Sequence, residues 1–187
     1  DAAWGDYDND GDIDLVVAPW GGAAVFYQND GQGSFDRQIV GDLGVEPNFT
    51  SGIAAEDYDN DGDLDLFISH WHGSGGTDEQ NQLYRNDGVN GNWLKIKLEG
   101  VKSNRSAIGA KLILTTTIEG NLVKQLRYLS GKTNWRNSSS HMLHFGLGDA
   151  STVNELKIEW PSGKQDIISK LKPNQTIQVK EGYGIQI

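Results

Sequence analysis

Two stretches of the chain concentrate carboxylates at a spacing that suits a hard metal cation. Residues 6–15 read DYDNDGDIDL and residues 57–66 read DYDNDGDLDL, so nearly the same loop occurs twice, 51 residues apart. Each copy fits the pattern D-x-D-x-D-G-x-x-D. The carboxylates of so compact a loop repel one another strongly. A calcium ion would relieve this repulsion, because it accepts about six to eight oxygen ligands at about 2.3–2.6 Å.

The pattern predicts one calcium ion in each loop. Alternate side chains supply carboxylates, and the glycine at the sixth position permits a sharp turn. The seventh residue supplies its backbone carbonyl, which leaves its side chain free to face water. The predicted ligands are Asp6, Asp8, Asp10, Asp12 (by its carbonyl) and Asp14 in the first loop, and Asp57, Asp59, Asp61, Asp63 (by its carbonyl) and Asp65 in the second.

Two other interpretations of the loops fit the sequence less well. An EF-hand needs a glutamate at the twelfth position and a helix on each side, but that position holds Val17 in one copy and Ile68 in the other. The residues after each loop, LVVA and LFIS, are typical of a buried strand instead. A solvated acidic turn without a metal would explain one copy, whereas two nearly identical copies favour calcium.

The elements around the loops also repeat. In each copy the loop leads into an apolar strand that ends at a tryptophan, and a glycine-rich connection then leads to a second strand, 24–28 or 82–85. An Asn-Asp-Gly turn follows at 29–31 and at 86–88. This is a hairpin signal, because glycine readily adopts positive φ. Such a repeat of short antiparallel strands is typical of a β-propeller blade.

The composition changes near residue 91. Residues 1–91 contain 19 acidic and 2 basic residues, a net charge of −17, and residues 92–187 contain 7 acidic and 14 basic residues, a net charge of +7. The second half shows the period-two alternation of half-buried strands. We therefore predict two domains, 1–91 and 92–187, the second a small β-sandwich or jelly roll. Its predicted strands are 93–100, 110–118, 122–129, 142–147, 153–160, 165–171 and 175–181.

The first half resembles the FG-GAP/VCBS repeat family of calcium-loop propeller blades, over roughly residues 1–90. The resemblance is carried by the two acidic loops and by the strands and turns that follow them. It implies the same ten aspartates as metal ligands. Because a propeller needs about four to eight blades to close, we expect about two blades of a truncated propeller. The remaining blades would lie upstream in a longer parent chain.

Three segments of the second half resemble the ASPIC/UnbV domain: SNRSAIGAKL (103–112), HFGLG (144–148) and WPSGK (160–164). This domain follows FG-GAP/VCBS blades in the cartilage acidic protein family, so the order of the two halves supports the resemblance. It implies a fold and a context more than an activity. The segment GKTNWRNSSS (131–140) departs from the Gly-Tyr/Ser-Gln type of segment usual in that family, so no ligand role is carried over to it.

Several other side chains could carry chemistry. His70 and His72 lie on one face of a strand and could bind zinc or copper, but the sequence offers no third ligand nearby, so packing is favoured. For His141 and His144 a structural role is favoured as well. The run Ser138–Ser140 suggests a hydrolase only weakly, because a G-x-S-x-G motif is missing. Trp135, in a polar segment, is the candidate for an exposed contact with a sugar ring or a partner.

The sequence thus predicts a calcium-binding extracellular module for adhesion or ligand binding, in which calcium is structural and which is not itself an enzyme. The alternative is a non-catalytic accessory region of a larger secreted or biosynthetic enzyme. A third interpretation places a metal-dependent reaction at His70 and His72.

Loops of this kind suit millimolar extracellular calcium, which predicts that the protein is secreted, periplasmic or on the cell surface. The expected partners are a carbohydrate or an extracellular protein, besides the upstream blades. The dispersed basic residues argue against nucleic acid. No apolar run approaches the length of a membrane span, about 18 residues.

Overall fold

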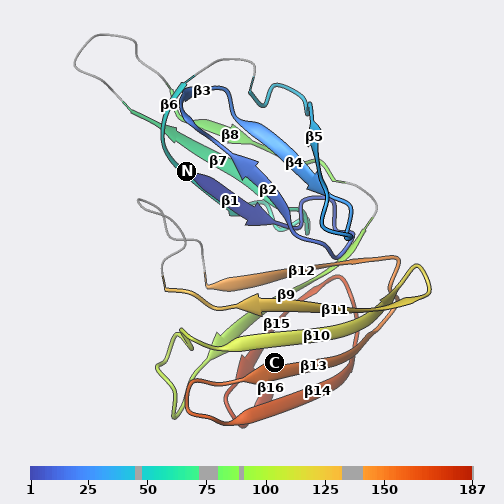
Figure 1. Ribbon diagram of the computed structural model, residues 1–187. Helices are drawn as coiled ribbons and strands as arrows, with labels where there is room; N and C mark the ends of the chain where they lie inside the picture. Colours follow the sequence, from blue (N-terminus) through green and yellow to red (C-terminus); the bar gives the residue numbers. More distant parts are fainter. Residues whose placement is uncertain (45–47, 72–79, 89–90, 132–140, 187) are drawn as a thin grey trace. The chain divides into compact units, whose positions relative to one another are not determined.

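The computed structural model describes residues 1–44, 48–71, 80–88, 91–131 and 141–186, and these residues form sixteen strands and no helix (Figure 1). The predicted all-β class is confirmed. By their contacts the residues form two compact units, one of Asp1–Tyr7 and Asp12–Asp87, the other of Gly88–Gly131 and Ser140–Ile187 together with Asp8–Gly11. The predicted domain boundary after residue 91 stays a prediction. None of the described residues belongs to a helix long and apolar enough to cross a membrane.

The first blade is a four-stranded antiparallel sheet in the order β1-β2-β4-β5. The first acidic loop joins β1 to β2, and the Asn-Asp-Gly turn at 29–31 lies between β4 and β5. These placements follow from the apolar run after the loop and from the glycine of the turn. The strands are β1 (Ala2–Gly5), β2 (Asp14–Val17), β4 (Val25–Asn29) and β5 (Phe35–Gln38).

The second blade has the order β3-β6-β7-β8, and the second acidic loop joins β6 to β7. Its strands are β3 (Trp20–Gly22), β6 (Asn48–Glu56), β7 (Asp65–His70) and β8 (Gln82–Tyr84). The long strand β6 was not predicted, because its sequence, NFTSGIAAE, lacks a clear alternation of apolar and polar residues. The two blades share one apolar core, made of Ala3, Val16, Ala18, Ile53, Leu66 and Ile68.

The second unit contains two four-stranded sheets, in the orders β11-β10-β13-β14 and β12-β9-β15-β16. Each of the seven predicted strands is present to within a residue at either end, and β16 is an eighth. The strand β15 runs parallel to β9, from Gln175 beside Leu94 to Lys180 beside Glu99. The strands are β9 (Asn92–Glu99), β10 (Lys111–Ile118), β11 (Asn121–Tyr128), β12 (Met142–Gly148), β13 (Val153–Glu159), β14 (Gln165–Leu171), β15 (Gln175–Lys180) and β16 (Gly184–Gln186).

A continuous apolar core fills this unit, with residues from both sheets, and the arrangement is that of a β-sandwich. Leu94, Ile96, Leu112, Leu114 and Phe145 are among its fully buried members. Side chains also connect the two sheets where their edge strands β11 and β12 meet. Gln125 donates from Nε2 to the carbonyl of Gly146 (2.6 Å), and Arg127 donates from Nε to the carbonyl of His144 (3.1 Å).

Candidate metal centre

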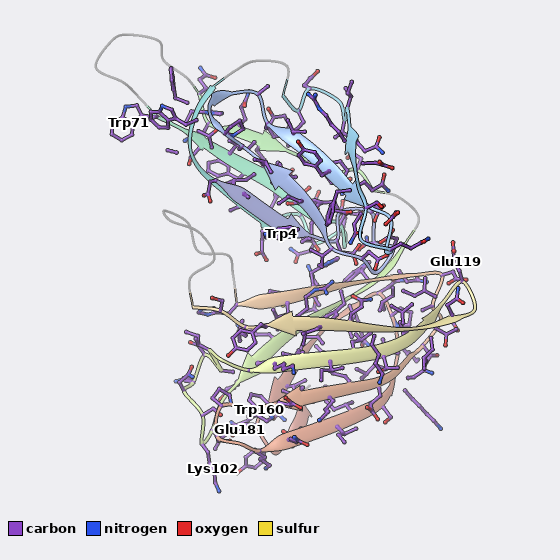
Figure 2. The ribbon with its side chains drawn as sticks, viewed as in Figure 1. Trp4, Trp71, Lys102, Glu119, Trp160 and Glu181 are labelled. Carbon is purple, nitrogen blue, oxygen red and sulfur yellow. The ribbon has the colours of Figure 1, made fainter. Side chains whose placement is uncertain are left out.

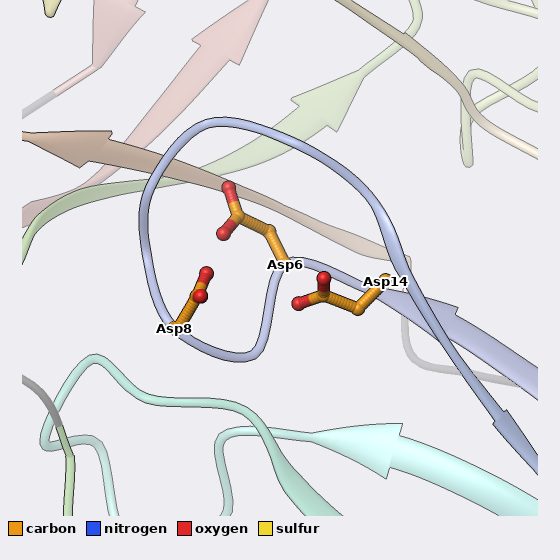
Figure 3. A group of neighbouring side chains, drawn as sticks. All are labelled: Asp6, Asp8 and Asp14. Carbon is orange, nitrogen blue, oxygen red and sulfur yellow. The ribbon is translucent and has the colours of Figure 1, made fainter. Parts of the chain in front are cut away.

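The first acidic loop brings three of its carboxylates together. One oxygen each from Asp6, Asp8 and Asp14 lies within 4.8 Å of the other two, and the Asp14 side chain lies beside the loop that contains Asp6 and Asp8 (Figure 3). Asp6 and Asp14 are 1% and 0% exposed, whereas Asp8 is half-buried. Oxygens that ligate one calcium ion at about 2.3–2.6 Å lie at most about 5 Å apart. The spacing therefore fits a common cation.

Backbone hydrogen bonds fix the position of Asp14 in this group. Its Oδ2 accepts from the backbone N–H of Tyr7 (3.0 Å), and its Oδ1 accepts from the N–H of Asn29 (2.9 Å). The carboxylate thus ties the start of its own loop to the end of β4. The loop closes through Asn9 and Gly11, whose φ values are 59° and 104°. Glycine takes such a φ without steric cost, and asparagine tolerates it.

The second loop repeats this local structure. Asp65 accepts from the N–H of Tyr58 (3.0 Å) and from the N–H of Asn86 (2.9 Å), as Asp14 does from the equivalent residues of the first repeat. Asn60 and Gly62 have φ values of 64° and 104°. In addition, the N–H of Gly62 donates to Asp57 (3.0 Å). The repeated sequence therefore produces a repeated backbone conformation, as expected for two copies of one binding loop.

The carboxylates that come together differ between the two loops. In the second loop the group consists of Asp57, Asp59 and Asp61, so the fifth position takes the place that the ninth position holds in the first loop. The other predicted ligands, Asp10, Asp12, Asp63 and Asp65, are outside these two groups. The side chains of Asp12 and Asp63 are half-buried, so the expectation that they face water freely is met only in part.

Burial and electrostatic repulsion act together on the carboxylates of the second loop. Burial first, and then the charges of Asp61, Asp57, Asp65 and Asp59, raise the pKa of Asp63 to about 6. The pKa of Asp65 is also raised, mainly by burial, although its hydrogen bonds from Asn86 and Tyr58 oppose the shift. Both shifts mean that the ionised forms of Asp63 and Asp65 are disfavoured in the loop without a cation. The donors are oxygens alone, which suits calcium or another hard cation better than zinc or copper.

Arg85, which directly follows β8, contacts the second loop and was not predicted from the sequence. Its Nε lies 3.0 Å from Asp59 and 3.0 Å from Asp87, and its Nη2 lies 3.6 Å from Asp61. Arg85 precedes Asn86, so its counterpart in the first repeat is Gln28, which precedes Asn29. The substitution of an arginine for a glutamine within an otherwise matching YxND turn was the signal that could have identified it.

A side chain also connects the two loops within the first unit. Asn86 donates from Nδ2 to the carbonyl of Leu64 in the second loop (3.3 Å) and to the carbonyl of Tyr7 in the first (2.8 Å). Its counterpart Asn29 donates to the carbonyl of Ile13 in its own loop (3.1 Å). The Asn86 side chain of the second hairpin therefore donates hydrogen bonds to both acidic loops.

The remaining sequence candidates do not form a second site among the described residues. His70 is 7% exposed, and its Nε2 lies 3.0 Å from Oε1 of Gln82, which supports the packing role. His72, Trp135 and Ser138–Ser140 lie outside the described residues. His141 is exposed and directly precedes β12, and His144 is half-buried within this strand.

Comparison with known families agrees with the two halves of the chain. The model of the family "FG-GAP-like repeat" matches residues 6–68, which include both acidic loops, and the model of the family "ASPIC and UnbV" matches residues 100–186. The chain combines an FG-GAP-like repeat with an ASPIC/UnbV domain. Both predicted resemblances are confirmed, and with them the assignment of the fold as part of a propeller followed by a β-sandwich.

The curated relatives have the same name. Cartilage acidic protein 1 of Homo sapiens is 31% identical over 170 residues, which are 85% of this chain and 24% of that protein. The proteins of that name from Xenopus tropicalis and Mus musculus are 32% and 33% identical over 124 residues, which are 66% and 65% of this chain and 18% of each relative. The chain thus spans about a quarter or less of the length of these relatives.

The ASPIC/UnbV domain contains a buried carboxylate that sequence reasoning missed. Glu181 is 2% exposed and lies at the same end of this unit as Lys102 and Trp160 (Figure 2). Its Oε2 accepts from three successive backbone N–H groups, those of Val101 (2.7 Å), Lys102 (2.8 Å) and Ser103 (2.8 Å). Its Oε1 accepts from the hydroxyls of Ser103 (3.1 Å) and Ser162.

Glu181 thereby joins two of the segments that carry the family resemblance, SNRSAIGAKL through Ser103 and WPSGK through Ser162. Burial by itself would raise the pKa of Glu181, but the hydrogen bonds from Ser162, Ser103, Val101 and Lys102 outweigh it and lower the pKa to about 2. A carboxylate so fully engaged by donors of its own chain has a structural role. The backbone groups that donate to it lie about 80 residues away in the sequence, and Ser162 lies 19 residues away, so no local pattern could have identified it.

Proposed function

We propose that this region is a calcium-binding extracellular module in which each FG-GAP loop holds one structural calcium ion. The observation that carries the proposal is the convergence of Asp6, Asp8 and Asp14 within 4.8 Å, two of them almost fully buried. The near-identical backbone of the second loop supports a second ion. Carboxylates of both loops would bind the ions, with the carbonyls of Asp12 and Asp63 as further ligands.

Calcium would supply positive charge and fix the loop geometry. Each loop lies between two strands of a blade, so an ion held there ties the start of the second strand to the end of the first. Binding that occurs only in the folded state stabilises it, by about 2.7 kcal/mol for each site at a free ion concentration of 100 times Kd. Two ions would also change the net charge of the chain from −10 to about −6.

Calorimetric titration of the 187-residue chain with calcium and, separately, with magnesium tests this proposal. We expect two calcium sites and a higher melting temperature in calcium than in chelator. Magnesium should bind much more weakly, because it prefers octahedral sites at about 2.0–2.1 Å and is dehydrated reluctantly. Asp8→Asn and Asp59→Asn should each remove one site and leave the other. No heat at millimolar calcium, or an equal response to magnesium, would contradict the proposal.

The adhesion or ligand-binding role rests on exposed aromatic side chains of the blades. Trp20 is 63% exposed, and its ring centroid lies 5.3 Å from that of Phe49 and 6.4 Å from that of Trp71. Phe49 and Trp71 are themselves 44% and 45% exposed. Exposed aromatic clusters suit stacking on sugar rings or contact with a protein partner.

Binding to arrayed glycans and to extracellular matrix proteins tests this role. We expect Trp20→Ala to reduce binding to any ligand found by about tenfold or more, because the central ring of the cluster is lost. Trp4→Ala, which removes another exposed tryptophan of the same unit, is the matched control and should leave that binding intact. Equal loss in both variants would argue against a defined aromatic surface.

The proposed location is extracellular, either secreted or on the cell surface. The name of the relatives associates them with cartilage, a tissue rich in extracellular matrix, and calcium loops of this type suit millimolar calcium. The periplasm has no support beyond the loops. The alternative function, a non-catalytic accessory region of a larger secreted or biosynthetic enzyme, would apply if the parent chain had a catalytic domain. We expect the 187 residues themselves to have no catalytic activity.

A further inference from the structure

The two acidic loops have the same aspartates and the same backbone turns but gather different carboxylates. The first loop brings together its first, third and ninth positions, and the second brings together its first, third and fifth. The two loop sequences, 6–15 and 57–66, differ only in that the first has Ile13 where the second has Leu64. This exchange of two apolar residues leaves all the carboxylates in place. The residues that surround the two loops differ as well, and one of them contacts the second group.

Arg85 is this residue. Its guanidinium contacts Asp59 at 3.0 Å and Asp61 at 3.6 Å, the third and fifth positions of the second loop. Asp87, on the same turn, lies 3.0 Å from Nε and holds the arginine at this place. The equivalent residue of the first repeat, Gln28, has no charge.

We propose that Arg85 is an intramolecular competitor for the cation of the second loop, so that this loop binds calcium more weakly than its aspartates alone would dictate. The inference rests on the proposed function of the loops. In the cation-free protein the guanidinium partly neutralises Asp59 and Asp61 and stabilises the loop. A bound calcium ion has to draw the same carboxylates away from Arg85 and is repelled by its charge. The second loop then responds to higher calcium concentrations than it would with glutamine at this position.

The size of the effect follows from Coulomb's law. A unit positive charge that contacts the same carboxylates as a divalent ion, in a largely aqueous and partly screened environment, would change the dissociation constant by about 3- to 10-fold. Because Arg85 is about half exposed, the effect should diminish as salt concentration rises. Such a salt dependence would not arise if Arg85 acted only through packing.

Calcium titration in an Asp8→Asn background, in which only the second loop is intact, isolates the effect. Arg85→Gln, which copies Gln28, should tighten the calcium affinity of this loop by about 3- to 10-fold at low ionic strength, and by less in high salt. Arg85→Lys retains the charge and should stay close to the unaltered protein. Arg37→Gln is the matched control, because it removes an exposed arginine of the first blade, and it should leave the affinity unchanged.

The melting temperature, compared between chelator and saturating calcium, is a second readout. In chelator, Arg85→Gln should lower the melting temperature, because the ion pairs with Asp59 and Asp61 are lost, whereas in saturating calcium it should not. An unchanged or weaker calcium affinity in Arg85→Gln, or the same melting shift in chelator and in calcium, would overturn the inference and leave the calcium sites themselves intact. If the unaltered protein binds no calcium in either loop, the proposed function fails, and this inference fails with it.

Discussion

Replacing Glu181 by alanine is expected to lower the free energy of unfolding by roughly 3–5 kcal/mol, because three buried backbone N–H groups and two hydroxyls lose their acceptor. The loss should be visible as a fall of about 6–15 °C in the melting temperature of the transition that includes the ASPIC/UnbV domain. Glu155→Ala, which removes an exposed glutamate of β13, should change stability by less than about 0.5 kcal/mol. Chemical unfolding followed by tryptophan fluorescence measures both variants.

Glu181→Gln separates charge from hydrogen bonding. The amide oxygen can still accept from the three N–H groups, and its NH2 can donate to the two serine hydroxyls, which then act as acceptors. Glutamine should therefore destabilise much less than alanine. If the two variants were equally destabilised, the hydrogen-bond network around Glu181 would not be the cause.

The same carboxylate should make stability depend on pH in acid. The pKa of Glu181 is lowered from 4.5 to about 2 in the folded protein. The unfolded chain therefore binds the proton more readily, and the contribution of the charge is present above about pH 4.5 and is lost as pH falls toward 2. The difference in stability between the unaltered protein and Glu181→Gln should shrink over this range. A difference that stays constant from pH 5 to about pH 2 would contradict the lowered pKa.

The second large effect is expected at Asp65. Asp65→Asn should weaken calcium binding at the second loop by about 100-fold or more, because a carboxylate ligand becomes a neutral amide. The stoichiometry should fall from two ions to one, and the rise in melting temperature on adding calcium should be roughly halved. Without calcium the change should be small. The loss of one backbone hydrogen bond is opposed because a neutral amide avoids the cost of burying the charge, which is the main cause of the raised pKa of Asp65, and the repulsion from Asp59 and Asp61.

Asp36→Asn, at an exposed position of β5, is the matched control and should retain both calcium sites. Calorimetry and thermal melts with and without chelator give the two measurements. Retention of two sites by Asp65→Asn would show that the ninth position of the second loop is not a ligand. In that case the group Asp57, Asp59 and Asp61 would be the better description of the site.

The acidic loops and most strands could be predicted because their signals are local. Alternation of apolar and polar residues marked β9 through β15, and the glycines at positions 11 and 62 marked the turns that have a φ of 104°. The strand β6 was not predicted, because small and polar residues such as those of SGIAAE do not produce a regular alternation of apolar and polar side chains. The strand β16 is only three residues long, Gly184–Gln186, and has little pattern to detect.

What could not be predicted depends on long-range pairing. The parallel pairing of β15 with β9 joins residues about 80 positions apart. The alternating pattern of a half-buried strand shows which face is buried and does not show the direction of the neighbouring strand. The roles of Arg85 and Glu181 could not be predicted for the same reason, because each residue acquires its contacts only when a segment distant in the sequence folds against it. The composition of the acidic loops predicted which groups could bind a cation, but it gave no information on which carboxylates converge.

The contacts of Gln125 and Arg127 with the carbonyls of β12 have a consequence for behaviour at high concentration. Strands at the edge of a sheet can pair with strands of other molecules, which leads to aggregation. In this domain the carbonyls of Gly146 and His144 already accept from side chains of the neighbouring edge strand. A foreign strand would have to displace an amide and a guanidinium before it could pair there, so the open seam of the sandwich is protected against edge-to-edge association.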